Sequence, residues 1–140
     1  MKRLIRELKD FLLAFVLAFL IYKGLGIALA TPIPLTSVTS ISMLPSLHPG
    51  DLVVVLGVGS PKVGDIVVYS ADCPALPKGD VIHRVIEVNE THLITKGDND
   101  LTNPMPDPCP VRREQVKGKV VFAIPVLGYP RLLVYYLLGI

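Results

Sequence analysis

The sequence lacks the features that mark several large classes of protein. Its net charge is only +2 and no basic stripe follows the N-terminal segment, so we expect no nucleic-acid partner. Its two cysteines, Cys73 and Cys109, are far apart and have no paired histidine, which is too few ligands for a metal site. We therefore expect neither a metal nor another cofactor. Only 140 residues are available, which is enough for one small domain.

A helical period of apolar residues is also missing between Val38 and Ile124. Instead, Gly-Asp pairs recur at 50–51, 64–65 and 79–80, and each pair leads into a run of β-branched residues. Such pairs form turns that feed strands. The sequence predicts strands at 52–55, 66–69, 81–86, 92–95 and 119–123. Many short strands joined by Gly and Pro turns predict a mainly β fold, either a small antiparallel β-barrel or two packed sheets.

The long apolar run of the chain lies near its N-terminus. Residues 11–30 are apolar at every position except Lys23. At about 1.5 Å per residue, this run spans the roughly 30 Å hydrocarbon core of a bilayer, and the Lys23 stem can reach toward the interface. Residues 1–10 carry four basic and two acidic side chains. The positive-inside rule then predicts a cytoplasmic N-terminus and a domain on the outer face of the cell membrane.

A cleavable secretory signal is the alternative to this anchor. Ala28-Leu29-Ala30 has the small-x-small form of a cleavage site. However, the apolar run is longer than a typical signal core, and nothing else would tether the domain. We therefore favour an uncleaved transmembrane helix.

These boundaries divide the chain into four segments. We expect a cytoplasmic N-terminus and transmembrane anchor at 1–30, a linker at 31–37, a β-domain at 38–125 and an apolar C-terminal segment at 126–140. The last segment is about half the length needed to cross a bilayer. Its neighbouring tyrosines suit the headgroup layer, so we expect a short apolar helix that contacts the membrane or a partner.

The predicted location outside the membrane bears on Cys73 and Cys109. Disulfides persist in that compartment, and each cysteine is followed by proline in a loop-like context. A bridge between two loops is one reading, and two free or buried thiols are the other, because spacing alone does not decide.

Ser42, near the start of the predicted β-domain, is a candidate nucleophile. Ser42 stands just before Pro45, and Ser40 points to the same side of an extended chain. A fixed Ser42 hydroxyl can attack a carbonyl, while Ser40 and the Ser42 amide stabilise an oxyanion. The same stretch carries Thr36 and Ser37, so a hydroxyl-rich strand start is the structural alternative.

The general base that a serine nucleophile needs is sought among the histidines. His83 lies in a predicted strand between apolar neighbours, where a packed core histidine is the commoner finding. His48 and His92 compete for the role, although His48 lies in a turn-prone Pro-Gly context soon after Ser42.

Five short motifs in order resemble those of type I signal peptidases. The resemblance runs from about Ser40 to Pro130, behind the N-terminal anchor. Its motifs are Ser42-Met43-Leu44-Pro45 with Gly50-Asp51, Gly64-Asp65-Ile66-Val67-Val68-Tyr69, Ile82-His83-Arg84-Val85, Thr95-Lys96-Gly97-Asp98-Asn99 and Gly118-Lys119-Val120-Val121-Phe122. One motif alone would be a weak match, but five in order are specific.

The position of His83 indicates which kind of signal peptidase the chain resembles. Bacterial members have Lys-Arg-Val where this chain has His83-Arg84-Val85, and that lysine is their base. Histidine there is similar to the archaeal and endoplasmic-reticulum kind, which implies a Ser-His-Asp enzyme. Lys96 is the lysine of the motif at 95–99. As a base it would need desolvation, of which the sequence gives no sign.

The resemblance leaves the triad acid open between aspartates. It offers Asp98, and also an aspartate within an Asp-Pro-x-Pro-Val pattern, which Asp107 fits after a longer loop than usual. We predict that Asp107 orients His83 and that Asp98 supports the site, with Asp100 as a further candidate. Any of them could instead be a turn residue. Ile41 departs from the family, because many members have glycine between the two serines.

The resemblance implies a membrane-bound serine endopeptidase that removes signal peptides from exported preproteins. Its partners would be signal peptides, the lipid bilayer and, in some cases, membrane subunits. The alternative from another class is a non-catalytic anchored β-domain, a subunit of an export or assembly complex. A third reading is a serine peptidase of the same fold that cuts itself in a regulator. The anchor and the lack of a DNA-binding module argue against that reading.

Overall fold

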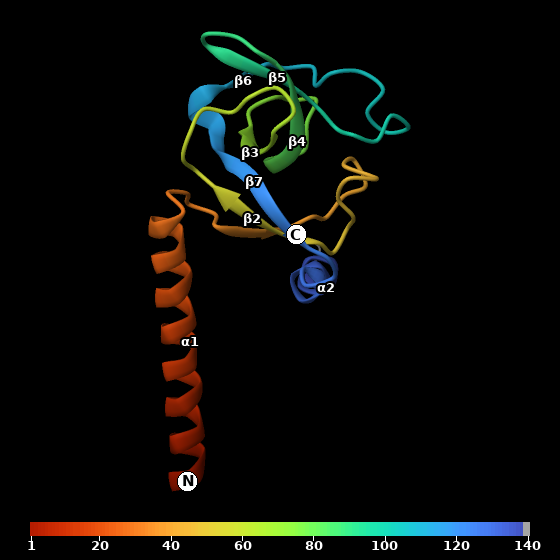
Figure 1. Ribbon diagram of the computed structural model, residues 1–140. Helices are drawn as coiled ribbons and strands as arrows, with labels where there is room; N and C mark the ends of the chain where they lie inside the picture. The colour runs from red at the N-terminus through yellow and green to blue at the C-terminus, as the bar shows by residue number, and fades with distance from the viewer. Residues whose placement is uncertain (139–140) are drawn as a thin grey trace.

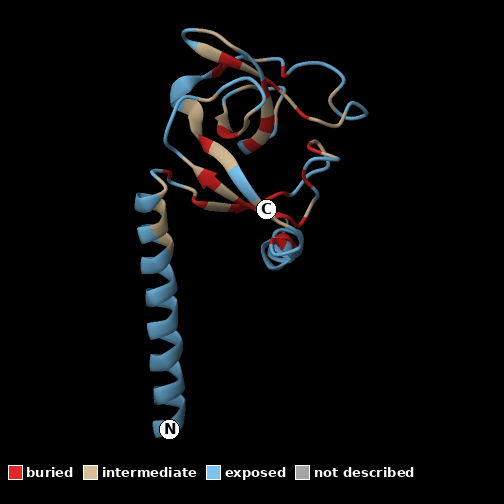
Figure 2. Cartoon of the chain, in the orientation of Figure 1, coloured by how far each residue is buried: buried red, intermediate tan, exposed pale blue. Residues whose placement is uncertain are grey.

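The computed structural model describes residues 1–138 as a long helix, a β-domain and a short C-terminal helix (Figure 1). Helix α1 (Lys2–Ala28) extends away from the β-domain as a stalk and has no buried residue (Figure 2). It is long and apolar enough to cross a membrane. Because no other part of residues 1–138 covers this apolar surface, a lipid environment suits it.

The β-domain is one antiparallel sheet of seven strands in the order β1-β2-β7-β3-β4-β5-β6. The strands are β1 (Leu35–Ser37), β2 (Leu52–Leu56), β3 (Ile66–Ala71), β4 (Gly79–Val88), β5 (His92–Lys96), β6 (Val111–Arg112) and β7 (Val116–Ile124), with a 3₁₀ turn, η1 (Arg113–Gln115), before β7. The predicted mainly β fold is confirmed. The sheet curls strongly but does not close into a barrel, because β1 and β6 are its two edges within the described residues.

Strands β1 and β6 are the two that the sequence pattern does not indicate. Both are too short for an alternating pattern to stand out. β1 lies at the end of the segment expected to be a linker, where Leu35 pairs with Val54 of β2. β6 pairs in the same way with β5, where Val111 faces Leu93. Each short strand is therefore held by its longer neighbour.

Two apolar clusters form the core of the β-domain. One contains Val38, Met43, Leu47, Val53, Val55 and Val68, and the other contains Val67, Tyr69, Val81, Val85, Leu93 and Val111. Strand β3 contributes to both clusters, because successive side chains of a strand point to opposite faces of the sheet. Met43 is only 1% exposed, so the residue directly after Ser42 anchors the serine segment in the core.

Helix α2 (Tyr129–Leu138) lies on the α1 side of the β-domain. Figure 1 shows α1 from the side and α2 down its axis, so the two helices are not parallel. Leu132 is the only buried residue of α2, and Arg131 Nη1 donates to Thr36 Oγ1 at 2.8 Å. The expected C-terminal helix is thus present, and the last two residues of that segment, 139–140, lie outside the described residues.

A disulfide joins Cys73, just after β3, to Cys109, just before β6. The two Cα atoms are 6.1 Å apart and the residues are separated by 36 positions. The bridge therefore ties the long loop between β5 and β6 to the end of β3.

We expect replacement of both Cys73 and Cys109 by serine to lower the free energy of unfolding by about 3 kcal/mol, because the unfolded chain is no longer cross-linked. Chemical denaturation of the variant and of the wild type, with and without reductant, measures this effect. Reductant should destabilise the wild type and leave the variant unchanged. Two alkylatable thiols in the native protein would contradict the bridge.

Candidate active site

Ser42 lies on a fixed segment with its hydroxyl group partly exposed. Its Oγ atom is 3.0 Å from Ser40 Oγ. Met43 and Leu47 are buried beneath the segment, at 1% and 4% exposure, whereas Ile41 on the other side is 50% exposed. The branched side chain of Ile41 therefore points away from the core. A hydroxyl on a backbone held in this way has the proximity advantage that a nucleophile needs.

His83 and Asp107 form a buried pair. His83 lies in β4, and its Nδ1 atom is 2.6 Å from Asp107 Oδ2. The two side chains are only 5% and 2% exposed. We assign the Nδ1 proton to the atom that faces the carboxylate, which leaves Nε2 as the basic nitrogen. The structure thus brings together the predicted base and the aspartate predicted to orient it.

Two hydroxyl groups complete the surroundings of the Asp107 carboxylate. Thr95 Oγ1 donates to Oδ2 at 2.6 Å, and Tyr69 OH donates to the same atom at 3.0 Å. Burial alone would raise the pKa of Asp107, but the hydrogen bonds from His83 and Thr95 outweigh it, so the pKa lies below its ordinary value. Burial raises the pKa of Tyr69, so that group stays a neutral donor. Asp107 is therefore an ionised, fixed acceptor.

The lowered pKa of Asp107 predicts a pH-dependent contribution to stability. An aspartate whose pKa is lower in the folded than in the unfolded state stabilises the fold above the unfolded pKa of about 3.9, and this stabilisation is lost as the pH falls through the folded pKa. We expect the wild type to unfold at a higher temperature than Asp107→Asn near pH 7. The gap should shrink toward about pH 3. Thermal unfolding of both proteins across this range checks the prediction, and a constant gap would contradict it.

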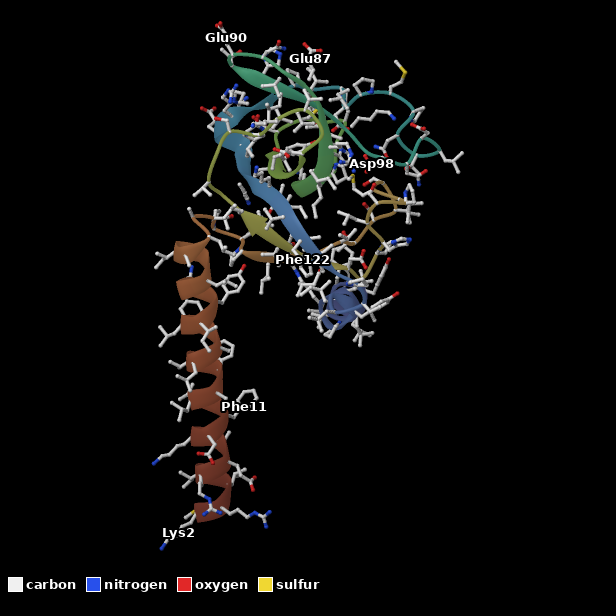
Figure 3. The ribbon with its side chains drawn as sticks, in the orientation of Figure 1. Lys2, Phe11, Glu87, Glu90, Asp98 and Phe122 are labelled. Atoms are coloured by element: carbon white, nitrogen blue, oxygen red, sulfur yellow. A yellow bond between two sulfur atoms is a disulfide. The ribbon has the colours of Figure 1, made fainter. Side chains whose placement is uncertain are left out.

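Asp98 lies on the other side of β4 from Asp107 and pairs with Arg84. Arg84 Nε donates to Asp98 Oδ1 at 2.8 Å and Nη2 donates to Oδ2 at 2.6 Å. Burial acts to raise the pKa of Asp98, but the hydrogen bonds from Arg84 and Ser46 lower it below its ordinary value. Asp98 belongs to the β5–β6 loop, and Figure 3 shows it on the side of the serine segment. Within residues 1–138, Asp98 shares no hydrogen bond with His83.

Arg84 links Asp98 to two further segments. Its Nη1 atom donates to Gly64 O at 2.7 Å and its Nη2 atom donates to Ser46 Oγ at 3.2 Å. Ser46 belongs to the same turn segment as Ser42. The Arg84–Asp98 pair therefore ties β4, which carries His83, to the segment that carries the candidate nucleophile.

The competing candidates lie outside this buried arrangement. Lys96 Nζ pairs with Asp100, whose side chain is 84% exposed, so this ion pair is separate from the buried contact between His83 and Asp107. The side chain of His48 is 65% exposed. The His92 ring hydrogen-bonds to Asn89 and Thr91 of its own hairpin. In the part of the chain that the structure describes, no cluster of three His, Cys, Asp or Glu side chains could hold a metal.

Tyr69 and Thr95 are site residues that were not predicted from the sequence, although both lie in its motifs. Val67 faces His83 across β3 and β4, and Thr95 faces Val85 across β4 and β5. Because side chains alternate along a strand, this register puts Tyr69, His83 and Thr95 on one face of the sheet. The signal for them is the pairing register, which a single sequence does not supply.

Ser42 and His83 belong to two separate hydrogen-bonded pairs. Ser42 Oγ contacts Ser40, and His83 Nδ1 contacts Asp107. No hydrogen bond joins Ser42 to His83 within residues 1–138. Such bonds are often long in an unliganded enzyme and tighten when substrate binds.

Comparison with known proteins gives consistent matches over most of the chain. Residues 8–101 match the family described as signal peptidase, peptidase S26. The chain is 33% identical over 143 residues to the signal peptidase complex catalytic subunit sec11 of Pyrenophora tritici-repentis, covering 94% of this chain and 81% of the relative. It is 32% identical over 147 residues to the subunit of the same name from Tuber melanosporum, covering 91% and 77%. The family match includes Ser42, His83 and Asp98, and Asp107 lies beyond it.

Proposed function

Because the chain belongs to the signal peptidase family, peptidase S26, we propose that it is a membrane-anchored serine endopeptidase that cleaves N-terminal signal peptides from exported preproteins. The observation that carries the proposal is the buried 2.6 Å contact between His83 Nδ1 and Asp107 Oδ2. A histidine held in one tautomer by an ionised carboxylate is the base that a serine nucleophile requires. We assign the nucleophile to Ser42.

The reaction follows from these assignments. Ser42 Oγ attacks the carbonyl carbon of the scissile peptide bond while its proton passes to His83 Nε2. Asp107 accepts the hydrogen bond from Nδ1–H and stabilises the imidazolium that forms. His83 then gives the proton to the leaving amine, and a water activated by the same histidine hydrolyses the acyl-enzyme. Ser40 Oγ–H and Ser42 N–H donate to the oxyanion of each tetrahedral intermediate.

The preprotein would bind as an extended strand at an edge of the sheet. Strand β1 is an edge strand and leads along the chain into the Ser42 segment. Main-chain hydrogen bonds to such an edge supply affinity, while pockets for alternate side chains supply specificity. We expect small side chains just before the scissile bond to fit shallow pockets beside Ser42.

The exposed apolar surfaces favour one orientation toward the bilayer. Leu133, Tyr136 and Leu137 of α2 are 60%, 67% and 74% exposed, and Phe122 of β7 is 62% exposed. Figure 3 shows Phe122 near α2 on the α1 side, with Glu87 and Glu90 at the opposite end of the domain. We propose that this apolar side rests on the membrane surface. The N-terminus would then be cytoplasmic and the β-domain would lie on the outer face of the cell membrane.

Contacts at the exit from α1 favour an anchor that is kept rather than cleaved. Gly57 N–H donates to Leu29 O at 2.8 Å, and the buried Thr31 donates its hydroxyl to Lys117 O at 2.8 Å. Cleavage after Ala30 would remove the first of these contacts and would create a charged terminus beside the second.

A cleavage assay tests the proposed function. The full-length protein in detergent should cut a preprotein at the end of its signal peptide, and N-terminal sequencing of the product identifies the bond. A folded wild type that cuts no preprotein would favour the non-catalytic subunit instead. Because the relatives are named as subunits of a complex, the assay is repeated on protein purified with its native membrane partners.

A further inference from the structure

Asn99 contacts both peptide groups that flank the Cα atom of Ser42. Its Nδ2 atom donates to Ile41 O at 2.9 Å, and its backbone N–H donates to Ser42 O at 2.9 Å. Building on the proposed function, we propose that Asn99 is a positioning residue, which aims the Ser42 N–H at the oxyanion and fixes the direction of the Ser42 hydroxyl.

The geometry of the peptide group determines the direction of the Ser42 N–H. Ile41 O and Ser42 N–H belong to one planar trans peptide, so they point in opposite directions. Two donors hold Ile41 O, Asn99 Nδ2 at 2.9 Å and the weaker Leu44 N–H at 3.2 Å. Together they also set where the Ser42 N–H points. Within residues 1–138 that N–H has no protein acceptor, which leaves it free for a substrate oxygen.

The second hydrogen bond fixes the peptide on the other side of Ser42. With both flanking planes held, the two soft backbone dihedral angles of Ser42 are set. The Cα–Cβ bond, and with it the reach of the hydroxyl oxygen, then has one direction. Positioning to well under 1 Å is what a nucleophile and an oxyanion donor both require.

The Asn99 side chain is itself held in one orientation. Its Oδ1 atom accepts the Leu101 N–H at 3.1 Å, so the other end of the amide, Nδ2, must face Ile41 O. The backbone carbonyl of Asn99 accepts the N–H of Thr102 at 3.1 Å and that of Asn103 at 2.7 Å. If the side-chain amide of Asn99 were turned over, Oδ1 would face the Ile41 carbonyl oxygen and Nδ2 would face the Leu101 N–H. Both contacts would then be unfavourable.

Close backbone packing supports the same role for the whole β5–β6 loop. A Cβ atom at Gly97 would lie 2.7 Å from Ser42 O and 2.7 Å from Asn103 Cγ, so only glycine lets the end of β5 pass this close to the serine. The loop that begins here also carries Asp107. One loop therefore orients the base through Asp107 and the nucleophile through Asn99.

Two substitutions of Asn99 remove its side-chain donor to Ile41 O in different ways, and both leave the longer hydrogen bond from the Leu44 N–H. Asn99→Asp keeps the acceptor for the Leu101 N–H and nearly the same shape, but it sets an oxygen against the Ile41 carbonyl. Asn99→Ser keeps a hydroxyl for the local turn and is too short to reach Ile41. Asn89→Asp is the matched control, because the hydrogen bonds of Asn89 within residues 1–138 go to the β4–β5 hairpin and Arg113.

The readouts separate positioning from a merely structural role. They are kcat and KM for a preprotein, and the affinities of a signal-sequence peptide ending in alaninal and of the same peptide ending in alaninol. The aldehyde can form a tetrahedral adduct with Ser42, whereas the alcohol cannot. Loss of one oxyanion donor typically costs about 10² to 10³ in kcat.

We expect both Asn99 variants to lose about 30-fold or more in kcat with KM within about twofold, and to lose aldehyde affinity by a similar factor with unchanged alcohol affinity. Asn89→Asp should match the wild type. Equal losses of aldehyde and alcohol affinity, unchanged kcat, or failure of both variants to fold would overturn the proposal. A wild type that neither cuts preprotein nor prefers the aldehyde would reject the proposed function itself.

Discussion

Ser42→Ala is expected to abolish preprotein cleavage, by at least about 10⁴-fold in turnover, while leaving the fold nearly intact. The change deletes one partly exposed oxygen whose only side-chain partner in residues 1–138 is the exposed Ser40. Core contacts of the neighbouring Met43 are kept. Turnover and melting temperature measured on the same preparation check both parts of the prediction.

Ser60→Ala provides the matched control for this variant, because Ser60 is exposed in the loop between β2 and β3. It should behave as the wild type in both measurements. Wild-type turnover by Ser42→Ala would move the nucleophile to another residue, with Ser40 as the first to test.

The second large effect is expected at the two aspartates, which we predict to act in different ways. Asp107→Asn should cost about 10⁴ in turnover with the geometry kept, because the amide favours the wrong tautomer of His83 and cannot stabilise imidazolium. Asp98→Asn should lower turnover less, and it should lower the free energy of unfolding by about 1 kcal/mol through the loss of its ion pair with Arg84.

Measuring turnover and melting temperature on both aspartate variants decides between the assignments. A fully active Asp107→Asn enzyme beside a well-folded but inactive Asp98→Asn enzyme would reverse them. The comparison is well matched, since each substitution removes one negative charge and keeps the shape of the side chain.

Local patterns in the sequence are strong enough to predict the anchor and most of the strands. The apolar run of α1 and the Gly-Asp turns act over a few residues, so they are legible without the tertiary structure. Strands β1 and β6 depend on pairing with distant partners. Whether the sheet closes depends on curvature accumulated over all seven strands, which no single motif encodes.

The candidate site also has residues that local motifs predict and residues that only the tertiary structure identifies. Ser42 and His83 lie in short motifs and can be named from them. The choice of acid depends on which face of β4 each aspartate reaches. Because neighbouring side chains of a strand point to opposite faces, Asp98, paired with Arg84, lies across the strand from the His83 ring. That relation appears only once the β5–β6 loop is placed in space.

The open sheet has a consequence for what this protein can recognise. Strand β1 has only three residues and pairs with β2 on one side, so its other side offers a short row of backbone donors and acceptors. Backbone groups are the same in every chain, and an edge of this length reads only a few of them. Recognition at this edge, as proposed above, would depend on whether a segment can be extended and narrow rather than on which residues it contains. Extended segments of very different sequence could therefore bind at this edge, whereas a folded domain could not.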